Sequence, residues 1–433
     1  MFTVLTFFIS RGIILMILFS VNKDSYGRFI LVKLTKDILR DHNEKVVLKT
    51  IRQLGEASRT TISQITGLST AAVTNITARL LKAGLIKENR HGKSKGGRRP
   101  ILLGINEKHS WAVGVKIGYL YLYFVVMDLL GVPVLEHEVT LDNADPDEIV
   151  EKIVEFVDTV AKIPEYGDRN FLGVGVAVSG SVDSERGVVK SSYILNWRNV
   201  PIGSMLEERI NAPVLLYNDV DSFAVAHYAI GKAKNYRSCI FITVGSGVGG
   251  AMILDGKLYT GQGGAGEIGH MTIVHGGRKC SCGSRGCLEA EIAFEAIVER
   301  IQKETEEDFP KKRFHATTEN EAIRYIQDAV QLNQAGVKRV FDEMGTLLGM
   351  AIKNIINIFA PDYLLIGGEA LLFKEFFLER AISVARKNAF GDLGETVVID
   401  VDEMGEVAWV QGVVLNLIEK EVFQVERRHV YEV

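Results

Sequence analysis

Cysteine is scarce in this chain of 433 residues, and three of its four cysteines, Cys280, Cys282 and Cys287, fall within eight positions. Three clustered cysteines leave one unpaired in any disulfide arrangement, and Cys280 and Cys282 are too close in sequence for an unstrained bridge. Cys239 stands apart in an apolar run and is interpreted as a small core residue. Low cysteine use with a thiolate cluster fits a reducing cytoplasm rather than an oxidising compartment.

The apolar N-terminus lacks the marks of a signal peptide. No basic segment precedes the run from Met1 to Ser20, and no small-residue cleavage site follows it. The run is long enough to span a membrane, but Arg11 would lie near the middle of the bilayer, which is costly. We interpret residues 1–32 as an apolar extension upstream of the working protein, as a misassigned start would produce. The alternative is that residues 1–32 anchor the protein in a membrane. On the first interpretation, no membrane partner is expected.

The small net charge of −4 hides an uneven distribution. Residues 33–99 carry 15 Lys and Arg against 5 Asp and Glu, a net +10, whereas residues 100–433 carry a net −16. A basic module on an acidic body is typical of a nucleic-acid-binding head. The length allows two or three domains. We expect a DNA-binding domain over residues 33–106 and a ligand-binding body over residues 107–433.

A histidine precedes the cysteine cluster at metal-ligand spacing. His270 lies ten residues before Cys280, and one imidazole with three thiolates is the usual ligand set of a structural zinc site. A catalytic zinc would need an open coordination position, and a catalytic thiol would need an activating base. The sequence therefore predicts structural Zn²⁺ bound by His270, Cys280, Cys282 and Cys287. Glu267 and Glu289 flank these ligands in the sequence. Because zinc would already have four ligands, these two carboxylates are available for another role.

The basic module has the pattern of a winged helix-turn-helix. Apolar spacing predicts helices over 41–55 and 60–65, and after a short glycine turn Ser69 caps a third helix that Gly84 ends. The exposed face of the third helix offers side chains suited to a major groove, and the glycine-rich loop after it offers cations for phosphates. A three-helix packing module followed by a solvated basic linker is the alternative. The residues expected to contact DNA are Ser69, Thr70, Thr74, Asn75, Arg79, Lys93, Lys95, Arg98 and Arg99.

The body contains two strand–glycine–strand hairpins, near 111–127 and 239–253, and each opens a mixed α/β half. This indicates a duplicated, two-lobed body with a cleft between the lobes. Polar residues follow two strands, Gly180-Ser181 after one and Asn218-Asp219 after another. Residues at the carboxyl ends of strands commonly face a ligand. Asp219 could alternatively be the cap of the helix that begins at Val220.

Several motifs together resemble the ROK family of repressors and sugar kinases, and in particular its transcriptional-regulator branch, over about residues 42–420. The family implies an α/β, actin-like ATPase (ribonuclease H-like) body, and zinc at the four ligands above. In the family's kinases the aspartate that matches Asp219 is the base that deprotonates the sugar. The motifs are Gly67-Leu68-Ser69, Gly97-Arg98-Arg99-Pro100, Asn218-Asp219, Gly264 to His270, and the cysteine cluster with Glu289. The residues implied to surround a sugar are Gly180, Ser181, Asn218, Asp219, Glu267, His270 and Glu289.

One motif departs from the family's kinases. Their phosphate loop has an aspartate, two glycines and a threonine, whereas this chain has Lys116 for the aspartate, Tyr119 for the second glycine and Leu120 for the threonine. Lysine cannot help to organise the Mg²⁺ that accompanies ATP. Tyr119 and Leu120 remove the close backbone approach and the hydroxyl that phosphates need. Near Trp197, Ile194 stands where relatives often carry an asparagine. The sequence argues against ATP and Mg²⁺ as cofactors.

We therefore predict a cytoplasmic, sugar-responsive transcriptional regulator, a repressor of carbohydrate-utilisation genes. It would bind a two-fold operator in double-stranded DNA as a homodimer or dimer of dimers. A sugar or sugar phosphate in the zinc-braced cleft would be the effector. One alternative is an ATP-dependent sugar kinase of the glucokinase or N-acetylglucosamine kinase type, with Asp219 as its catalytic base. The other is a regulator controlled by a protein partner.

Overall fold

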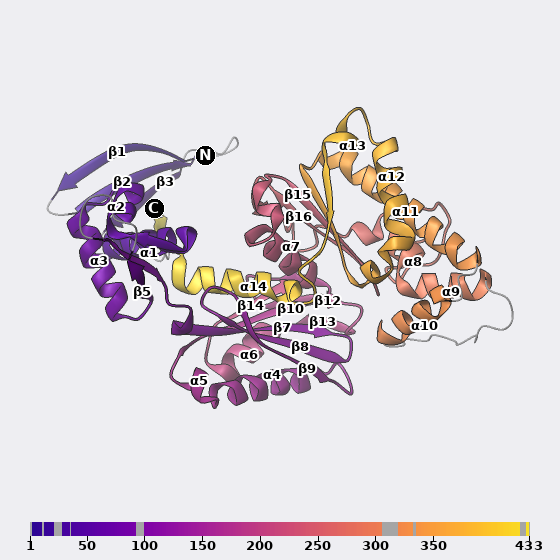
Figure 1. Ribbon diagram of the computed structural model, residues 1–433, viewed down its shortest axis with the longest axis horizontal. Coiled ribbons are helices and arrows are strands. Elements are labelled where there is room, and N and C mark those ends of the chain that lie inside the picture. The colour runs from indigo at the N-terminus through magenta and orange to yellow at the C-terminus, as the bar shows by residue number, and fades with distance from the viewer. Residues whose placement is uncertain are drawn as a thin grey trace.

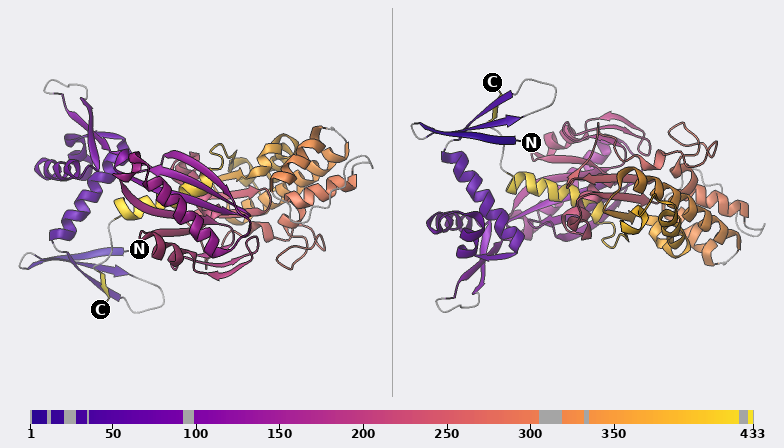
Figure 2. Two further views of the ribbon diagram at one scale, coloured as in Figure 1. Left: turned by 90° about the horizontal axis from the view of Figure 1, so that it is seen from below. Right: turned by 90° about the horizontal axis from the view of Figure 1, so that it is seen from above.

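The computed structural model shows an elongated molecule with a small head at one end and a two-lobed body (Figures 1 and 2). The described residues are 2–10, 13–20, 28–34, 36–91, 99–304, 319–331, 335–424 and 430–432. The predicted fold class is correct, because a helix-turn-helix head with a small sheet precedes a mixed α/β body of two lobes.

The head follows from its caps and turns. Ser58 accepts a hydrogen bond from the Thr61 amide and begins α2, and Gly67 ends that helix at a φ of 71°, which favours glycine. Ser69 accepts from the Ala72 amide and begins α3. The apolar faces of these helices meet at Ile62 and Val73, which are both fully buried. The elements are α1 (Lys36–Leu54), β4 (Glu56–Ser58), α2 (Arg59–Thr66), α3 (Thr70–Lys82), β5 (Ile86–His91) and β6 (Ile101–Ile105), with sheet order β4-β6-β5.

The first lobe is built on a five-stranded sheet of order β14-β10-β7-β8-β9. Its first three strands in chain order form an antiparallel meander, and β10 and β14 extend the sheet in parallel. The main elements are β7 (Ser110–Gly118), β8 (Tyr121–Asp128), β9 (Pro133–Thr140), α4 (Pro146–Ala161), α5 (Pro164–Gly167), β10 (Asn170–Val178), α6 (Ile202–Ile210) and β14 (Val214–Asn218). A small sheet adds β11 (Ser181–Asp183), β12 (Val188–Ser192) and β13 (Trp197–Val200).

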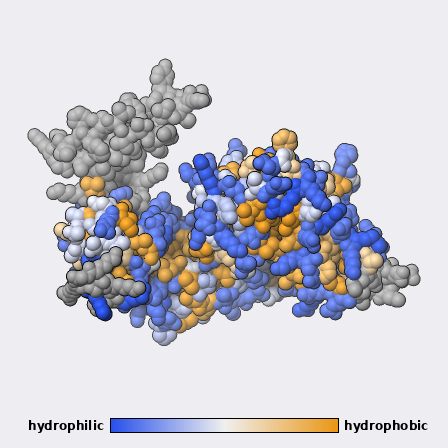
Figure 3. All heavy atoms as spheres, turned by 45° about the horizontal axis from the view of Figure 1, so that its top comes forward, coloured by the Kyte–Doolittle hydropathy of each residue, from blue (hydrophilic) through white to orange (hydrophobic). Residues whose placement is uncertain are grey.

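The second lobe repeats this plan, with sheet order β17-β16-β15-β18-β19. Again a meander comes first and two parallel strands follow, so the duplication predicted from the two hairpins is present. Figure 3 shows apolar surface on this lobe among hydrophilic side chains. The strands are β15 (Cys239–Val244), β16 (Val248–Leu254), β17 (Lys257–Leu258), β18 (Tyr363–Gly367) and β19 (Val398–Val401). The helices are α8 (Leu288–Ile292), α9 (Phe294–Glu304), α10 (Glu319–Gln331), α11 (Ala335–Phe359), α12 (Lys374–Asn388) and α13 (Leu393–Thr396).

Two helices occupy the middle of the body, α7 (Asp219–Ala229) and α14 (Ala408–Ile418). Their crossing depends on Gly412, because a Cβ there would lie 1.8 Å from the carbonyl oxygen of Ser222. The hydroxyl of Ser222 also accepts a hydrogen bond from the Val413 amide, at 3.0 Å. Figure 1 shows α14 running from between the lobes toward the head. The two helices are thus packed too closely for one to move freely without the other.

Ion pairs join the last turn of this central helix to the head. After α14 the chain forms a π-helical turn, Glu419–Phe423. Glu419 lies 2.7 Å from the Lys49 ammonium and 2.5 Å from the Arg52 guanidinium of α1. The Arg52 guanidinium also lies 3.9 Å from the centroid of the Phe423 ring. The head is therefore attached to the body through α14 as well as through the covalent connection after β6.

The N-terminal segment forms strands rather than a helix. β1 (Phe2–Ser10), β2 (Ile13–Ser20) and β3 (Arg28–Leu34) pair in an antiparallel sheet, and β20 (Val430–Glu432) pairs with β3. Among the described residues, no helix has the length and apolar character needed to cross a membrane.

Candidate functional site

The predicted metal ligands converge in one loop of the second lobe. His270 ends a short 3₁₀ helix, Ile268–His270, and Cys287 immediately precedes α8. The ligand atoms of His270, Cys280, Cys282 and Cys287 all lie within 4.8 Å of one another. The loop returns on itself through Gly286, where a Cβ would lie 1.6 Å from the Val274 carbonyl oxygen. Sequence neighbours and a sharp glycine turn are therefore enough to bring the four ligands together.

The spacing of these atoms suits a tetrahedral metal and not a disulfide. The sulfur atoms of Cys282 and Cys287 lie 3.7 Å apart, and the Cys280 sulfur lies 3.5 Å from Nδ1 of His270. A disulfide would need about 2.05 Å. A tetrahedron with zinc–sulfur bonds of about 2.3 Å has edges of about 3.8 Å. Burial and the neighbouring thiols raise the pKa of Cys287 to about 12, so a nearby cation would favour the thiolate form of this residue. The donor set fits zinc.

His270 connects the ligand cluster to a group of carboxylates. Its Nδ1 faces the cysteines, whereas its Nε2 lies 3.9 Å from Oε2 of Glu267. Burial raises the pKa of Glu267, and the charges of Glu289 and Asp219 raise it further, while His270 opposes the rise. Glu289, in the first turn of α8, accepts a hydrogen bond from the Val248 amide at 3.1 Å. Residues far apart in sequence thus share one electrostatic environment.

The two strand-end motifs of the first lobe meet through Asn218. Its side-chain oxygen accepts from the Val220 and Asp221 amides, so Asn218 is the N-cap of α7. Its side-chain nitrogen donates to the Gly180 carbonyl oxygen at 3.0 Å. The alternative that Asp219 caps this helix is wrong, because Asp219 is already its first helical residue. The carboxylate of Asp219 itself accepts a hydrogen bond from the Val220 amide at 2.9 Å.

Gly180 fits closely within the first lobe, and Ser181 connects this lobe to the second. Gly180 has a φ of 117°, and a Cβ there would lie 2.2 Å from the Ser191 carbonyl oxygen. The hydroxyl of Ser181 donates to the carbonyl oxygen of Gly263, at 2.8 Å, in the loop that leads to Glu267. The contacts therefore join Gly180 to Asn218, Ser181 to the Gly263 loop, and Glu267 to His270. Ile194 and Asn196 are both exposed, so neither is held in a buried contact.

Asp219 faces an unexpected set of neighbours. Burial raises its pKa, and the positive charge of Lys116 opposes that rise. Lys116 lies 3.9 Å from Oε1 of Glu369, and its ammonium lies 4.2 Å from the centroid of the Trp409 ring. Asp221 lies two residues further along α7, where burial and the charges of Asp219 and Glu267 raise its pKa to about 7. The sequence did not predict a role for Glu369, Trp409 or Asp221. The only local signal was Gly367-Gly368, directly before Glu369.

The residues at and after the start of α3 that were predicted to contact DNA are accessible to solvent. Ser69, Thr70, Thr74, Asn75 and Arg79 are all exposed. Three of them also have structural contacts, because Ser69 caps α3, the Thr74 hydroxyl donates to the Thr70 carbonyl oxygen, and Arg79 forms an ion pair of 2.6 Å with Glu44. Arg99 is exposed at the start of the return strand, and Lys93, Lys95 and Arg98 lie outside the described residues. Helix α3 thus presents small and hydrogen-bonding side chains, as a recognition helix would.

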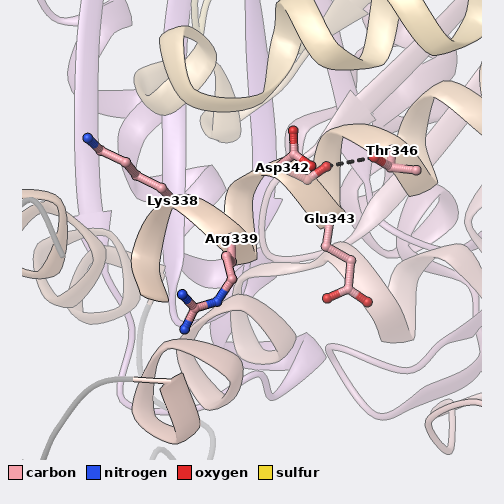
Figure 4. A pocket seen from close by; sticks show the side chains of 5 residues that line it. All are labelled: Lys338, Arg339, Asp342, Glu343 and Thr346. Carbon is pink, nitrogen blue, oxygen red and sulfur yellow. Dashed lines mark hydrogen bonds between the residues drawn. The ribbon is translucent and has the colours of Figure 1, made fainter. Parts of the chain in front are cut away.

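A separate hollow lies on α11. Figure 4 shows its lining, which comes from successive turns of that one helix: Lys338, Arg339, Asp342, Glu343 and Thr346. Two of its charged groups already have partners, because Arg339 pairs with Glu304 at 2.6 Å and Glu343 pairs with Arg300 at 3.0 Å. None of the predicted site residues lines it, so it is not a candidate effector site.

Comparisons with known proteins agree with this architecture. Residues 112–419 match the model of the ROK family, and residues 42–95 match that of the MarR family. This chain belongs to the ROK family. The xylose repressor of Caldicellulosiruptor bescii is 30% identical over 388 residues, which cover 88% of this chain and 96% of that protein. The DNA-binding transcriptional dual regulator NagC of Escherichia coli is 28% identical over 342 residues, covering 77% and 82%.

Two solved structures of the ROK family are similar in fold. One is a ROK transcriptional regulator described as a homologue of the E. coli MLC protein, with a TM-score of 0.75 at 23% identity, covering 89% of this chain and 98% of that chain. The other is the ROK glucokinase of Streptomyces griseus in complex with glucose and AMPPNP, with a TM-score of 0.58 at 25% identity, covering 70% and 97%. The regulator aligns over the head as well as the body, since it covers more of this chain.

The altered phosphate loop of this ROK protein is a tight hairpin turn. β7 and β8 stay paired up to Gly118 and Tyr121, so Tyr119 and Leu120 alone make the turn. Leu120 has a φ of 60°, in the left-handed region that side chains rarely adopt. A Cβ on Gly118 would lie 2.1 Å from the Tyr121 ring. The ring of Tyr121 therefore occupies the space beside Gly118 in this turn.

Proposed function

We propose that this protein is a sugar-responsive, DNA-binding transcriptional repressor of carbohydrate-utilisation genes. Its similarity to repressors named for xylose and N-acetylglucosamine, which extends over 88% and 77% of this chain, supports this function. The matching head has the caps, glycine turn and exposed α3 face of a DNA reader. Such proteins read two-fold operators as dimers, and we infer that this chain does the same.

The observation that carries the proposal is a continuous packing route from the carboxylates to the head. Asn218 and Asp219 begin α7, and Ser222 of α7 holds the Val413 amide of α14. At the end of α14, Glu419 pairs with Lys49 and Arg52 of α1. A sugar that favours one arrangement of the lobes would thereby change the position of the head. Such a shift requires that the sugar binds the two arrangements with different affinity.

The sugar site we propose comprises the predicted residues that flank this route. Carboxylates accept charge-assisted hydrogen bonds from adjacent sugar hydroxyls. Side-chain amides can both accept hydrogen bonds from hydroxyls and donate to them. Structural Zn²⁺ on His270, Cys280, Cys282 and Cys287 would hold the loop that carries Glu267 and leads to Glu289. Zinc would supply no chemistry to the ligand, because its four positions are filled by the protein. The sugar-contacting residues proposed are Gly180, Ser181, Asn218, Asp219, Glu267, His270 and Glu289.

The test couples DNA binding to sugar binding. Duplexes selected from a random pool by the full-length protein would be titrated with D-xylose, D-glucose and N-acetylglucosamine, and each sugar's affinity would be measured by calorimetry. We expect one of these sugars to bind and to weaken DNA binding by about tenfold or more. The same samples would be assayed for sugar-dependent ATP hydrolysis. Robust turnover would favour the kinase alternative, in which Asp219 is the base. Sequence-specific DNA binding that no sugar changes would favour control by a protein partner.

A further inference from the structure

An ion pair near the end of β7 joins the two lobes. Lys116 comes from β7 of the first lobe, and Glu369 follows β18 of the second, with 3.9 Å between the ammonium nitrogen and Oε1. The ammonium also lies 4.2 Å from the Trp409 ring centroid and 6.0 Å from that of Tyr121. The Lys116 side chain is 12% exposed. The lysine is therefore held by a carboxylate and an aromatic face, not directed into solvent.

The Glu369 carboxylate also occupies the space beside the glycine turn at Gly245, where backbone amides could otherwise bind an anion. A Cβ on Gly245 would lie 2.0 Å from Oε2 of Glu369, so the carboxylate rests against this turn. The Gly245 amide donates to the Gly247 carbonyl oxygen, and the Val248 amide donates to Glu289. These two backbone donors are thus already used within the protein. A phosphate here would have to displace a carboxylate and break existing hydrogen bonds.

The charges around this ion pair are mostly negative. Lys116 acts on the carboxylates of Asp219 and Glu406, and it opposes the rise in pKa that burial causes at both. Glu369 raises the pKa of the same two groups. Glu267 and Glu289 lie on the metal side of Asp219. Zinc would not offset them, because Zn²⁺ with three thiolates carries a net charge of about −1. One lysine shared among several carboxylates leaves the described surroundings of the pair negative.

We propose that Lys116 and Glu369 are specificity residues that restrict the effector to neutral, unphosphorylated sugars. This inference rests on the proposed function, since it concerns the same sugar site. A neutral sugar can donate its hydroxyls to the carboxylates. A sugar phosphate would bring about two negative charges beside Asp219 and Glu369, where Lys116 is already committed to a carboxylate.

The first test compares matched ligands on the wild-type, full-length protein. D-glucose and D-glucose 6-phosphate, and N-acetylglucosamine and its 6-phosphate, would be titrated by calorimetry, with D-xylose as a neutral sugar that has no 6-position. We expect the effector to be a neutral sugar that binds at least about tenfold more tightly than its phosphate ester. A phosphate ester that binds as tightly as its neutral partner, or more tightly, overturns the inference.

The second test is a double-mutant cycle. Glu369→Gln keeps the shape of the side chain and frees Lys116, so the affinity for the sugar phosphate relative to the neutral sugar should rise about three- to tenfold. Adding Lys116→Met, which keeps the apolar stem on Trp409, should abolish that gain. Glu375→Gln, on the exposed start of α12, is the charge-matched control and should leave the ratio unchanged. An unchanged ratio in Glu369→Gln overturns the role of the pair.

The outcomes separate this inference from the function on which it rests. A sugar phosphate that binds preferentially and releases DNA overturns the specificity of Lys116 and Glu369 but leaves the regulator intact. A protein that binds no sugar of either class overturns both. Thermal unfolding of each variant shows whether it is folded, and the wild-type comparison needs no variant.

Discussion

Arg52 of the head donates a hydrogen bond of 2.5 Å to Glu419 at the end of the body's central helix. Lys49 approaches the other oxygen of the same carboxylate at 2.7 Å. One side chain therefore receives two cations from α1, 367 and 370 positions earlier in sequence. The position of the head relative to α14 depends on this carboxylate.

Removing that carboxylate should uncouple the head from the body. Glu419→Ala leaves two cations without their partner and should cost about 1–2 kcal/mol of stability. The variant should still bind DNA and sugar, but the sugar should change DNA affinity less than in the wild type. Calorimetry and DNA titration with and without sugar measure this. Glu421→Ala, on the same turn but exposed, is the control. Full coupling in Glu419→Ala would remove α14 from the proposed route.

The Glu419 contacts also predict a response to acid. Although burial alone would raise it, hydrogen bonds from Lys49 and Arg52 hold the pKa of Glu419 below 4.5. A carboxyl group whose pKa is lower in the folded state stabilises that state above its unfolded pKa, and the stabilisation is lost as pH falls through the folded pKa. The protection factors of the α1 amides against hydrogen exchange should therefore fall below pH 4.5 in the wild type, and this acid step should be absent in Glu419→Ala.

Zinc removal should act on the sugar site through His270. Cys282→Ser removes one ligand, so we expect less than the wild-type metal content, a lower melting temperature, and a sugar affinity reduced by about tenfold or more. Elemental analysis, thermal unfolding and calorimetry check these three effects. Cys239→Ala is the matched control, because this buried cysteine lies outside the ligand cluster. If Cys282→Ser retained zinc and bound sugar with unchanged affinity, the proposal that zinc holds the sugar-binding loop in place would be wrong.

Asp221 should make the protein less stable as the pH rises. Its pKa is about 7 in the folded protein against 3.8 ordinarily, chiefly through burial and secondly through Asp219 and Glu267. The folded state thus holds this proton more tightly, so stability contributed by the protonated carboxyl is lost as pH rises from about 4 to above 7. Asp221→Asn mimics the protonated form. It should stabilise the protein by roughly 2–4 kcal/mol at pH 8 and by little at pH 4.

Denaturant unfolding at several pH values measures this difference. Asp147→Asn is the control, since Asp147 also lies in the first turn of a helix but is exposed. A gain for Asp221→Asn that does not depend on pH would show that the carboxyl does not titrate as its surroundings indicate.

The sequence predicted those parts of the site that are local in the chain. Ser58, Gly67 and Ser69 set the boundaries of the head helices, and the metal ligands lie within a short loop. It failed where contacts come from distant segments. In α1, apolar spacing alone would bury Leu54, but Leu54 is 46% exposed and Leu48 is buried, because the neighbouring elements decide which face is covered.

The same reason hid the partners of Lys116. The sequence showed a lysine in place of an acid, and this excluded an aspartate's role with magnesium. That it pairs with Glu369 and lies on Trp409 follows from the meeting of two lobes and a C-terminal helix. The spacing of residue types within a single helix or strand cannot show which residues of other elements it will contact.

For the head, Arg99 should contribute charge rather than sequence recognition. It is exposed at the base of the basic loop. Arg99→Ala should weaken binding to all duplexes by a similar factor and reduce the slope of log affinity against log salt by about 1. Lys234→Ala removes the same charge from the body and should change neither quantity. An unaltered salt slope in Arg99→Ala would exclude a phosphate contact at this position.

Asn75 should instead read bases. It is exposed in the middle of α3, one residue beyond Thr74, whose hydroxyl donates to the Thr70 carbonyl oxygen at 2.7 Å and is therefore partly committed to the helix. An asparagine amide can bond the edge of an adenine in the major groove, and loss of such a pair costs about 1–3 kcal/mol. Asn75→Ala should lower affinity for the selected duplex by that amount, leave nonspecific binding unchanged, and relax the preference at one base pair. Competition against single-base-pair variants of the duplex measures this. Equal losses on every variant would assign Asn75 to the backbone and leave base reading to the other exposed residues of α3.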